Sequence, residues 1–86
     1  MRVDKFLKVS RLIKRRTKAK DIADQGRVWL NGKDVKASHT VKIGDELTVE
    51  FGQKKVIVRV DSTLESKRKD DAVLMYTFLR EEPIQV

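Results

Sequence analysis

The spacing of apolar residues changes near Gly26, and this change sets the fold class of the chain. Before Gly26, apolar side chains recur three and four residues apart, which is typical of helices that bury one face. After Gly26, they alternate with polar residues, which is typical of strands that bury one face. A chain of 86 residues has room for one domain. We therefore predict an α+β fold, with two short N-terminal helices packed on a small, mainly antiparallel sheet.

The first helix is predicted from its buried face. Val3, Phe6 and Leu7 lie three and four residues apart, and we expect the helix to end near Ser10. Asp4 lies where an acid either caps the helix or stabilises its first turn.

The second helix is predicted to run from Thr17 to Gly26. The hydroxyl of Thr17 can accept a hydrogen bond from a free backbone N–H, so we expect Thr17 to be the N-cap. Gly26 lies where a left-handed residue commonly follows a helix. Lys18 and Lys20 lie near the helix start, where cations are unfavourable against the helix dipole, so a phosphate held there would compensate them. The buried face is predicted to consist of Ala19, Ile22 and Ala23.

Turn signals separate the strands. Asn31-Gly32 predicts a hairpin, because a type I′ turn needs positive φ at both central residues. We expect a short return strand over residues 33–35, then a loop over residues 36–42. Further strands are predicted for residues 46–51 and residues 56–60.

The C-terminal part is harder to predict, because short apolar runs do not separate helix from strand. Residues 61–69 are polar, and we expect a loop there. A short helix is predicted to start near Asp70, with an extended stretch over residues 76–80 as a further possibility. Pro83 is expected to end regular structure.

A basic run is the strongest functional signal. Six of the ten residues from Arg11 to Lys20 are basic and none is acidic. Residues 1–36 hold twelve basic and four acidic residues, whereas residues 37–86 hold eight and nine, so the net charge of +7 belongs to the first half. Like charges repel, and binding a polyanion would relieve that repulsion and release counterions. A solvated basic face without a partner is the alternative.

Composition argues against several classes of function. The chain has no cysteine and one histidine, so we expect no disulfide, no metal site and no cofactor. Charges near the N-terminus leave no signal-peptide core, and no apolar run approaches the roughly 20 residues of a membrane span. We therefore expect a cytoplasmic protein. The acidic pairs Asp70-Asp71 and Glu81-Glu82 point apart on a helix or strand, so we expect solvated carboxylates and no enzyme activity.

Two aromatic residues each have two interpretations. His39 lies in a polar loop and is either an ordinary surface histidine or a contact to a nucleic-acid backbone. Trp29 lies away from the core side of its strand. We favour packing of Trp29 beneath the C-terminal segment that carries Tyr76 and Phe78, because both faces of a sheet need cover. Stacking on a nucleotide base is the alternative.

Four motifs resemble the S-four RNA-binding domain, a family named after ribosomal protein four of the small subunit. In chain order they are residues 2–7 (RVDKFL), residues 10–17 (SRLIKRRT), residues 23–32 (ADQGRVWLNG) and residues 41–47 (VKIGDEL). The resemblance covers residues 1 to about 60 in the family's order and spacing. It implies an S-four domain over residues 1–60 with a small curved sheet, and a C-terminal extension over residues 61–86 packed on the same domain.

Among stand-alone S-four proteins, the chain resembles those of ribosome-associated quality control more than the longer heat-shock S-four proteins. The resemblance implies a monomeric factor of the large ribosomal subunit. It would contact large-subunit rRNA and P-site tRNA after a stalled ribosome splits, while a partner factor extends the nascent chain with alanine. The implied RNA-binding residues are Arg2, Lys5, Lys8, Arg11, Lys14, Arg15, Arg16, Lys18 and Lys20. Asp4 would orient Arg2 or cap its helix.

Three alternatives stay open. A general recycling or assembly factor of the large subunit would use the same basic corner. A DNA-binding module needs a helix that presents Asn, Gln or Arg to base edges, whereas the second helix carries Asp21 and Asp24. A binder of anionic membranes needs an amphipathic helix with bulky apolar residues on an exposed face, and none is obvious.

Overall fold

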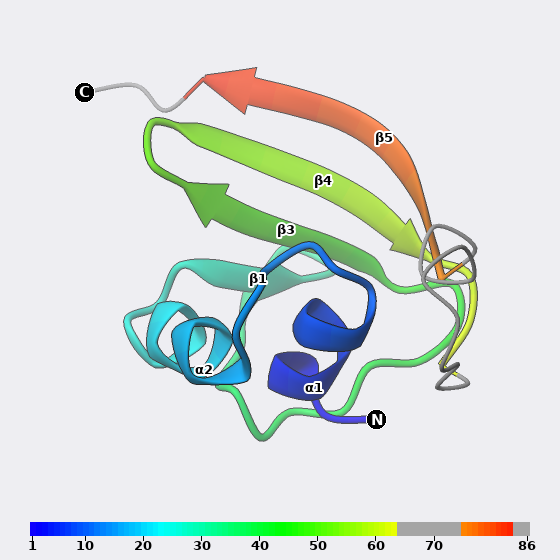
Figure 1. Cartoon of the computed structure of the whole chain (residues 1–86). Helices are drawn as coiled ribbons and strands as arrows, with labels where there is room; N and C mark the ends of the chain where they lie inside the picture. Colours follow the sequence, from blue (N-terminus) through cyan, green and yellow to red (C-terminus); the bar gives the residue numbers. More distant parts are fainter. Residues whose placement is uncertain (64–74, 84–86) are drawn as a thin grey trace.

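Two helices pack against one face of an antiparallel sheet in the computed structural model, which describes residues 1–63 and 75–83 (Figure 1). Within these residues the sheet has five strands in the order β2-β1-β3-β4-β5, and every neighbouring pair is antiparallel. The predicted α+β class is confirmed. The elements are α1 (Val3–Val9), α2 (Arg16–Asp24), β1 (Val28–Leu30), β2 (Lys33–Asp34), β3 (Glu46–Phe51), β4 (Lys54–Val60) and β5 (Tyr76–Pro83).

The first helix forms where its apolar spacing predicts it. Val3, Phe6 and Leu7 are fully buried. Ser10 is the C-cap, and its backbone N–H donates to a carbonyl within the helix. Arg11 then takes a left-handed conformation with φ of 65°, so the chain turns away from the helix axis. The helix therefore ends at the predicted place.

The second helix begins two residues earlier than predicted, because its N-cap is Arg15 and not Thr17. The N-cap is Arg15, whose side chain makes no capping hydrogen bond, and Thr17 is exposed within the first turn. Arg16 is the first helical residue, and its guanidinium pairs with Asp4 of α1 at 3.4 Å. We attribute the error to this tertiary contact, because contacts of this kind commonly override local preferences.

The end of α2 follows the prediction. Gly26 has φ of 76°, and its N–H donates to the carbonyl of Ala23. The N–H of Arg27 donates to the carbonyl of Ile22. These are the two hydrogen bonds of a Schellman motif, which satisfies carbonyls that a helix end leaves free.

The predicted hairpin joins β1 and β2. Asn31 and Gly32 have φ of 53° and 84°, as the turn requires. The side chain of Asn31 also ties the hairpin to the start of β3: its amide donates to Asp45 at 3.1 Å, and its carbonyl accepts from the N–H of Glu46 at 2.9 Å. The hairpin turn is therefore held by a contact 15 residues away in the sequence.

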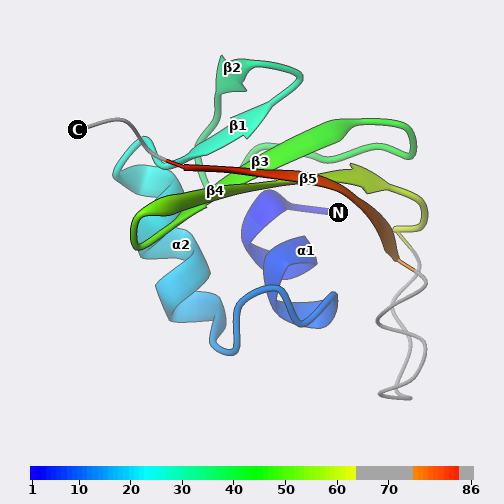
Figure 2. The ribbon, with the colours of Figure 1, turned by 90° about the horizontal axis from the view of Figure 1, so that it is seen from above.

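One hydrophobic core lies between the helices and the sheet. Its helical part comes from α1 and α2, and its sheet part comes from the inward positions of β1, β3 and β4. Figure 2 shows both helices side by side beneath these strands. Among the buried side chains are Val3, Phe6, Leu7, Ala19, Ile22, Ala23, Val28, Leu30, Leu47, Val49, Val58 and Val60.

The C-terminal strand β5 extends the sheet. It pairs along β4 from Tyr76 opposite Val60 to Pro83 opposite Lys54. The extended alternative is therefore confirmed for residues 76–80, and regular structure ends at Pro83 as predicted. The helix predicted near Asp70 lies outside the described residues.

Trp29 does not pack beneath the C-terminal segment, so the favoured interpretation was wrong. Strands β3 and β4 lie between β1 and β5. Tyr76 packs against the core, whereas Trp29 is partly buried on the outer face and has the ammonium of Lys55 4.4 Å from its ring centroid. A long lysine stem can cover apolar surface, and this one covers the ring.

Candidate nucleic-acid interface

A buried carboxylate links the two helices and holds two arginines. Asp4 is 2% exposed and lies in the first turn of α1. Arg2 donates to both of its oxygens, from Nε at 3.2 Å and from the terminal nitrogen at 3.3 Å. Arg16 Nε lies 3.4 Å from Oδ2, and the N–H of Lys5 donates to Oδ1 at 2.8 Å. We refer to Arg2, Asp4 and Arg16 as the arginine clamp.

The arginine clamp keeps two guanidinium groups in place at the surface. The side chains of Arg2 and Arg16 are each 48% exposed, whereas that of Asp4 is 3% exposed. Each arginine has five N–H donors, and the carboxylate occupies only some of them. The remaining donors are free to bind a planar anion in a fixed orientation. The sequence left open whether Asp4 orients Arg2 or caps its helix, and it did not predict that Asp4 also holds Arg16.

The two helices and their connection carry further cations that no described carboxylate neutralises. Six exposed Lys and Arg side chains of the helices and their connection form no ion pair with any described residue. They are Lys8, Arg11, Lys14, Arg15, Lys18 and Lys20. Lys5, also predicted to bind RNA, is partly buried.

The basic residues of the sheet are different, because most of them are paired. The pairs are Arg27 with Glu50, Lys54 with Glu81, Arg59 with Asp61, and Arg80 with Glu46 and Glu82. Carboxylates of the sheet thus neutralise most of its own basic side chains. The net positive charge is left on the helical side of the molecule, where a polyanion would be attracted.

A buried residue anchors the basic connection between the helices. Ile13 is 6% exposed and belongs to the core, and its N–H donates to the carbonyl of Leu7 at 3.0 Å. The residues around it are Arg11, Lys14 and Arg15, which are all exposed. Because Ile13 fixes the middle of the connection, these cations stand on a positioned loop rather than on a free chain.

The cations of α2 do not all share one side. At about 100° per residue, Lys18 and Lys20 project roughly 160° apart around the helix, on either side of its buried face. Lys20 lies four residues after Arg16 and therefore on the same side as the arginine clamp. Lys8 similarly follows Asp4 by four residues on α1. Helical spacing therefore places Lys20 on the side of Arg16, whereas Lys18 projects elsewhere.

The start of α2 adds backbone donors to this surface. No acidic side chain lies in its first turn, and its N-cap makes no side-chain hydrogen bond. The first backbone N–H groups of a helix have no partner within the helix, and the helix dipole is positive at this end. An anion beside Arg16 would therefore meet both a guanidinium and free amides.

The described residues also bear on metal binding and on membrane insertion. No group of three or more potential metal ligands occurs within residues 1–63 and 75–83. In the same residues, no helix is long and apolar enough to cross a membrane. His39 is exposed, and its carbonyl accepts from the N–H of Val3 at 2.7 Å. Its backbone therefore has a structural role, whereas its side chain faces an open hollow that is considered below.

Comparison with known proteins agrees with this geometry. The family described as S4 domain matches residues 1–47. The chain is 61% identical over 84 residues to the RQC P-site tRNA stabilizing factor of Bacillus subtilis (strain 168), with 98% of each chain covered. It is 45% identical over 85 residues to the protein of that name from Streptococcus pneumoniae (strain ATCC BAA-255 / R6), covering 99% of this chain and 97% of the other.

Solved structures show the same fold. Heat Shock Protein 15 of Vibrio cholerae, described as trimeric, aligns with a TM-score of 0.84 and 28% identity, covering 92% of this chain and 81% of the other. The protein HP1423, solved in solution, aligns with a TM-score of 0.75 and 34% identity, covering 93% and 98%. The two-helix basic surface on an antiparallel sheet therefore defines an S4-domain protein. Within that class, the chain belongs to the family of the RQC P-site tRNA stabilizing factors.

Proposed function

We propose that the chain is a non-enzymatic RNA-binding factor of the large ribosomal subunit. It contacts large-subunit rRNA and P-site tRNA on stalled, split ribosomes in the cytoplasm, and it supports alanine tailing of the nascent chain by a partner factor. Its relatives carry the name RQC P-site tRNA stabilizing factor, which supports a tRNA partner. The observation that carries the proposal is the set of six exposed cations on the helices and their connection that form no ion pair with a described residue.

Binding in this proposal depends on counterion release and on preorganised donors. Each phosphate neutralised by a cation releases condensed ions, which gives affinity that falls as salt rises. Asp4 reduces the local charge by one, yet it fixes two guanidinium groups before RNA arrives. Arg2 and Arg16 then lose less side-chain entropy when RNA binds, and their exposed guanidinium groups can bind a phosphate through two parallel hydrogen bonds. The proposed phosphate contacts are Arg2, Lys5, Lys8, Arg11, Lys14, Arg15, Arg16, Lys18 and Lys20.

The arrangement of cations around α2 suits a protein that lies between two RNA segments. Lys20 lies on the side of the arginine clamp, and Lys18 projects roughly 160° away from it. A protein held between tRNA and rRNA needs cations on more than one side. We therefore assign Lys18 to a different RNA segment from the one that meets Arg16.

We propose that the chain consists of an RNA-binding domain and a C-terminal extension. Residues 1–60 form the RNA-binding domain, and residues 61–86 form a C-terminal extension, of which the described strand β5 joins the sheet. The antiparallel pairing of β5 with β4 supports this division, because β5 lies far from the helical surface at the edge of the sheet (Figure 1). The extension would therefore stabilise the domain without contacting the same RNA.

A second candidate is a general recycling or assembly factor of the large subunit. The same exposed cations of the helices and their connection would serve it. The two functions differ in the particle that is bound. A quality-control factor should prefer large subunits that carry peptidyl-tRNA, whereas a general factor should bind empty subunits equally well. Sedimentation of the tagged chain with both particles and with whole ribosomes separates the two.

The RNA surface is tested by replacing one arginine of the clamp. Arg16→Ala should weaken binding to tRNA-bearing large subunits by about 1–3 kcal/mol and reduce the slope of log K against log salt by about one. Arg80→Ala is the matched control, because Arg80 is 53% exposed and lies on the neutralised outer face of the sheet. Equal affinities and slopes for the two variants would remove Arg16 from the interface.

A further inference from the structure

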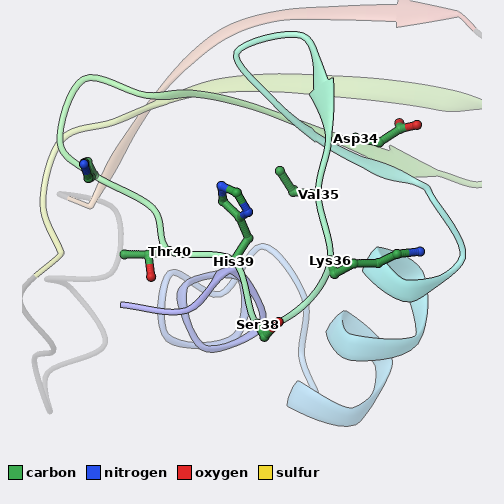
Figure 3. A pocket seen from close by; sticks show the side chains of 7 residues that line it. Asp34, Val35, Lys36, Ser38, His39 and Thr40 are labelled. Atoms are coloured by element: carbon green, nitrogen blue, oxygen red, sulfur yellow. The ribbon is translucent and has the colours of Figure 1, made fainter.

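A polar hollow lies beside the N-terminus, formed by residues 34–42 between β2 and the start of β3 (Figure 3). We call it the 34–42 pocket. Its volume of about 650 Å³ falls in the range of pockets that hold small ligands. None of the nine predicted RNA-binding residues lines it, so it is separate from the surface described above.

Three side chains offer hydrogen-bond donors to the 34–42 pocket. His39, Thr40 and Lys42 line it and are exposed. Lys42 forms no ion pair with any residue that the structure describes. Its backbone N–H donates to the carboxylate of Asp45 at 2.8 Å, which fixes the base of its side chain. The pocket therefore presents an imidazole, a hydroxyl and an ammonium on a fixed backbone.

The other charged residues of this segment are directed elsewhere. In Figure 3 the carboxylate of Asp34 points away from His39, and the side chain of Lys36 extends toward α2. There the ammonium of Lys36 donates to the carbonyl of Asp24 at 3.2 Å. Asp34 therefore does not neutralise the donors of His39. The carboxylate of Asp45 lies nearer to Lys42, but it accepts from the backbone N–H of Lys42 and the amide of Asn31 and forms no ion pair with the ammonium, so the pocket favours an anion.

Backbone pairing joins the 34–42 pocket to the arginine clamp. Arg2 and Thr40 form an antiparallel bridge, and the N–H of Val41 donates to the carbonyl of Met1 at 2.9 Å. Directly paired residues place their side chains on the same side, with Cβ atoms about 5 Å apart. Thr40 thus lies beside Arg2, and Arg2 is already held by Asp4. One anionic chain can contact both places.

We propose that the 34–42 pocket binds a phosphate group of the same RNA chain that meets the arginine clamp, through His39, Thr40 and Lys42. This inference rests on the proposed RNA-binding function and extends its surface past Arg2 to His39, Thr40 and Lys42. The imidazole and hydroxyl donate hydrogen bonds, and the ammonium supplies the charge. The pocket adds affinity and orientation but no base specificity.

The first test uses charge and salt. Lys42→Ala should weaken RNA binding about three- to tenfold and reduce the salt slope by about one, as expected for one phosphate contact. Lys33→Ala is the matched control. Lys33 is exposed on β2 directly before the residues that form the pocket, forms no ion pair with a described residue and does not line the pocket. Equal effects of the two substitutions would overturn the proposal.

The second test uses His39 as a reporter. It is the single histidine of the chain, so its imidazole proton resonances can be assigned directly. Titration with tRNA should shift these resonances in the parent, and Lys42→Ala should require more tRNA for the same shift. Saturation by inorganic phosphate without any response to tRNA would overturn the proposal, because it would identify a site for a free anion.

The two hypotheses fail in different ways. If Arg16→Ala weakens RNA binding while Lys42→Ala and the His39 resonances do not respond, the pocket proposal is wrong and the RNA-binding function stands. If neither Arg16→Ala nor Lys42→Ala changes RNA binding, both are wrong.

Discussion

Replacing Asp4 with asparagine separates two explanations of the basic surface. If total charge alone determined RNA affinity, Asp4→Asn would strengthen binding, because it raises the net charge of the arginine clamp by one. If the orientation of Arg2 and Arg16 matters, the same change should weaken binding. The two explanations therefore predict effects of opposite sign.

The cost to stability follows from the contacts of the carboxylate. Asp4 accepts two hydrogen bonds from Arg2, one from the N–H of Lys5, and pairs with Arg16. Asparagine keeps one accepting oxygen but loses the charge. Hydrogen bonds to charged groups contribute about 1.5–3 kcal/mol, and half-exposed arginines reduce that contribution. We expect a loss of about 1–2 kcal/mol, which lowers the Tm of a domain this size by roughly 5–15 °C.

The assay is RNA affinity at several salt concentrations, measured below the Tm of the variant. We expect Asp4→Asn to weaken binding about three- to thirtyfold with a nearly unchanged salt slope, because cations remain but their positions are lost. Asp21→Asn is the control, since Asp21 is an exposed acid of α2 that forms no ion pair with a described residue. Tighter binding by Asp4→Asn than by Asp21→Asn would refute the orienting role.

Two further predictions concern the sheet. Hydrogen bonds from Thr77 and Arg59 lower the pKa of Asp61 below its ordinary value of 3.8. The ionised form therefore stabilises the fold above that pH, and this contribution is lost as the pH falls through the folded-state pKa. Asp61→Asn should reduce the Tm at pH 6, and the difference in Tm from the parent should shrink toward pH 2, whereas a constant difference would contradict this. Lys55→Ala should change the fluorescence of Trp29, the single tryptophan, because the Lys55 ammonium lies 4.4 Å from the centroid of its ring. The same substitution should leave RNA affinity within about twofold of the parent. A loss of RNA affinity as large as that of Arg16→Ala would instead place RNA on the outer face of the sheet.

Local sequence signals predicted the elements of this fold well. The apolar spacing of α1, the left-handed Gly26 and the Asn31-Gly32 turn each depend on a few neighbouring residues, and each is confirmed. The alternation of apolar and polar residues over residues 46–51 and 56–60 likewise predicted β3 and β4. Such features need no knowledge of the rest of the molecule.

Errors arose where distant residues decide the outcome. Arg16 begins α2 while its side chain reaches Asp4, twelve residues earlier, so a prediction from local capping chose Thr17 instead. Trp29 was assigned to the wrong neighbour, because strand order cannot be deduced from alternation within each strand. The same limit applies to the interface: the sequence listed the cations, whereas the sharing of Asp4 by Arg2 and Arg16 required the three-dimensional arrangement.

The central claim is that the helical side of the molecule, with its unpaired cations, faces RNA. The most direct measurement is a cryo-EM reconstruction of the chain bound to a large ribosomal subunit that carries P-site tRNA. The account predicts phosphates beside Arg2 and Arg16 and along the connection between α1 and α2, with the paired outer face of the sheet away from RNA. A reconstruction with RNA on the outer face around Trp29, and with the Arg11–Arg15 connection in solvent, would contradict it.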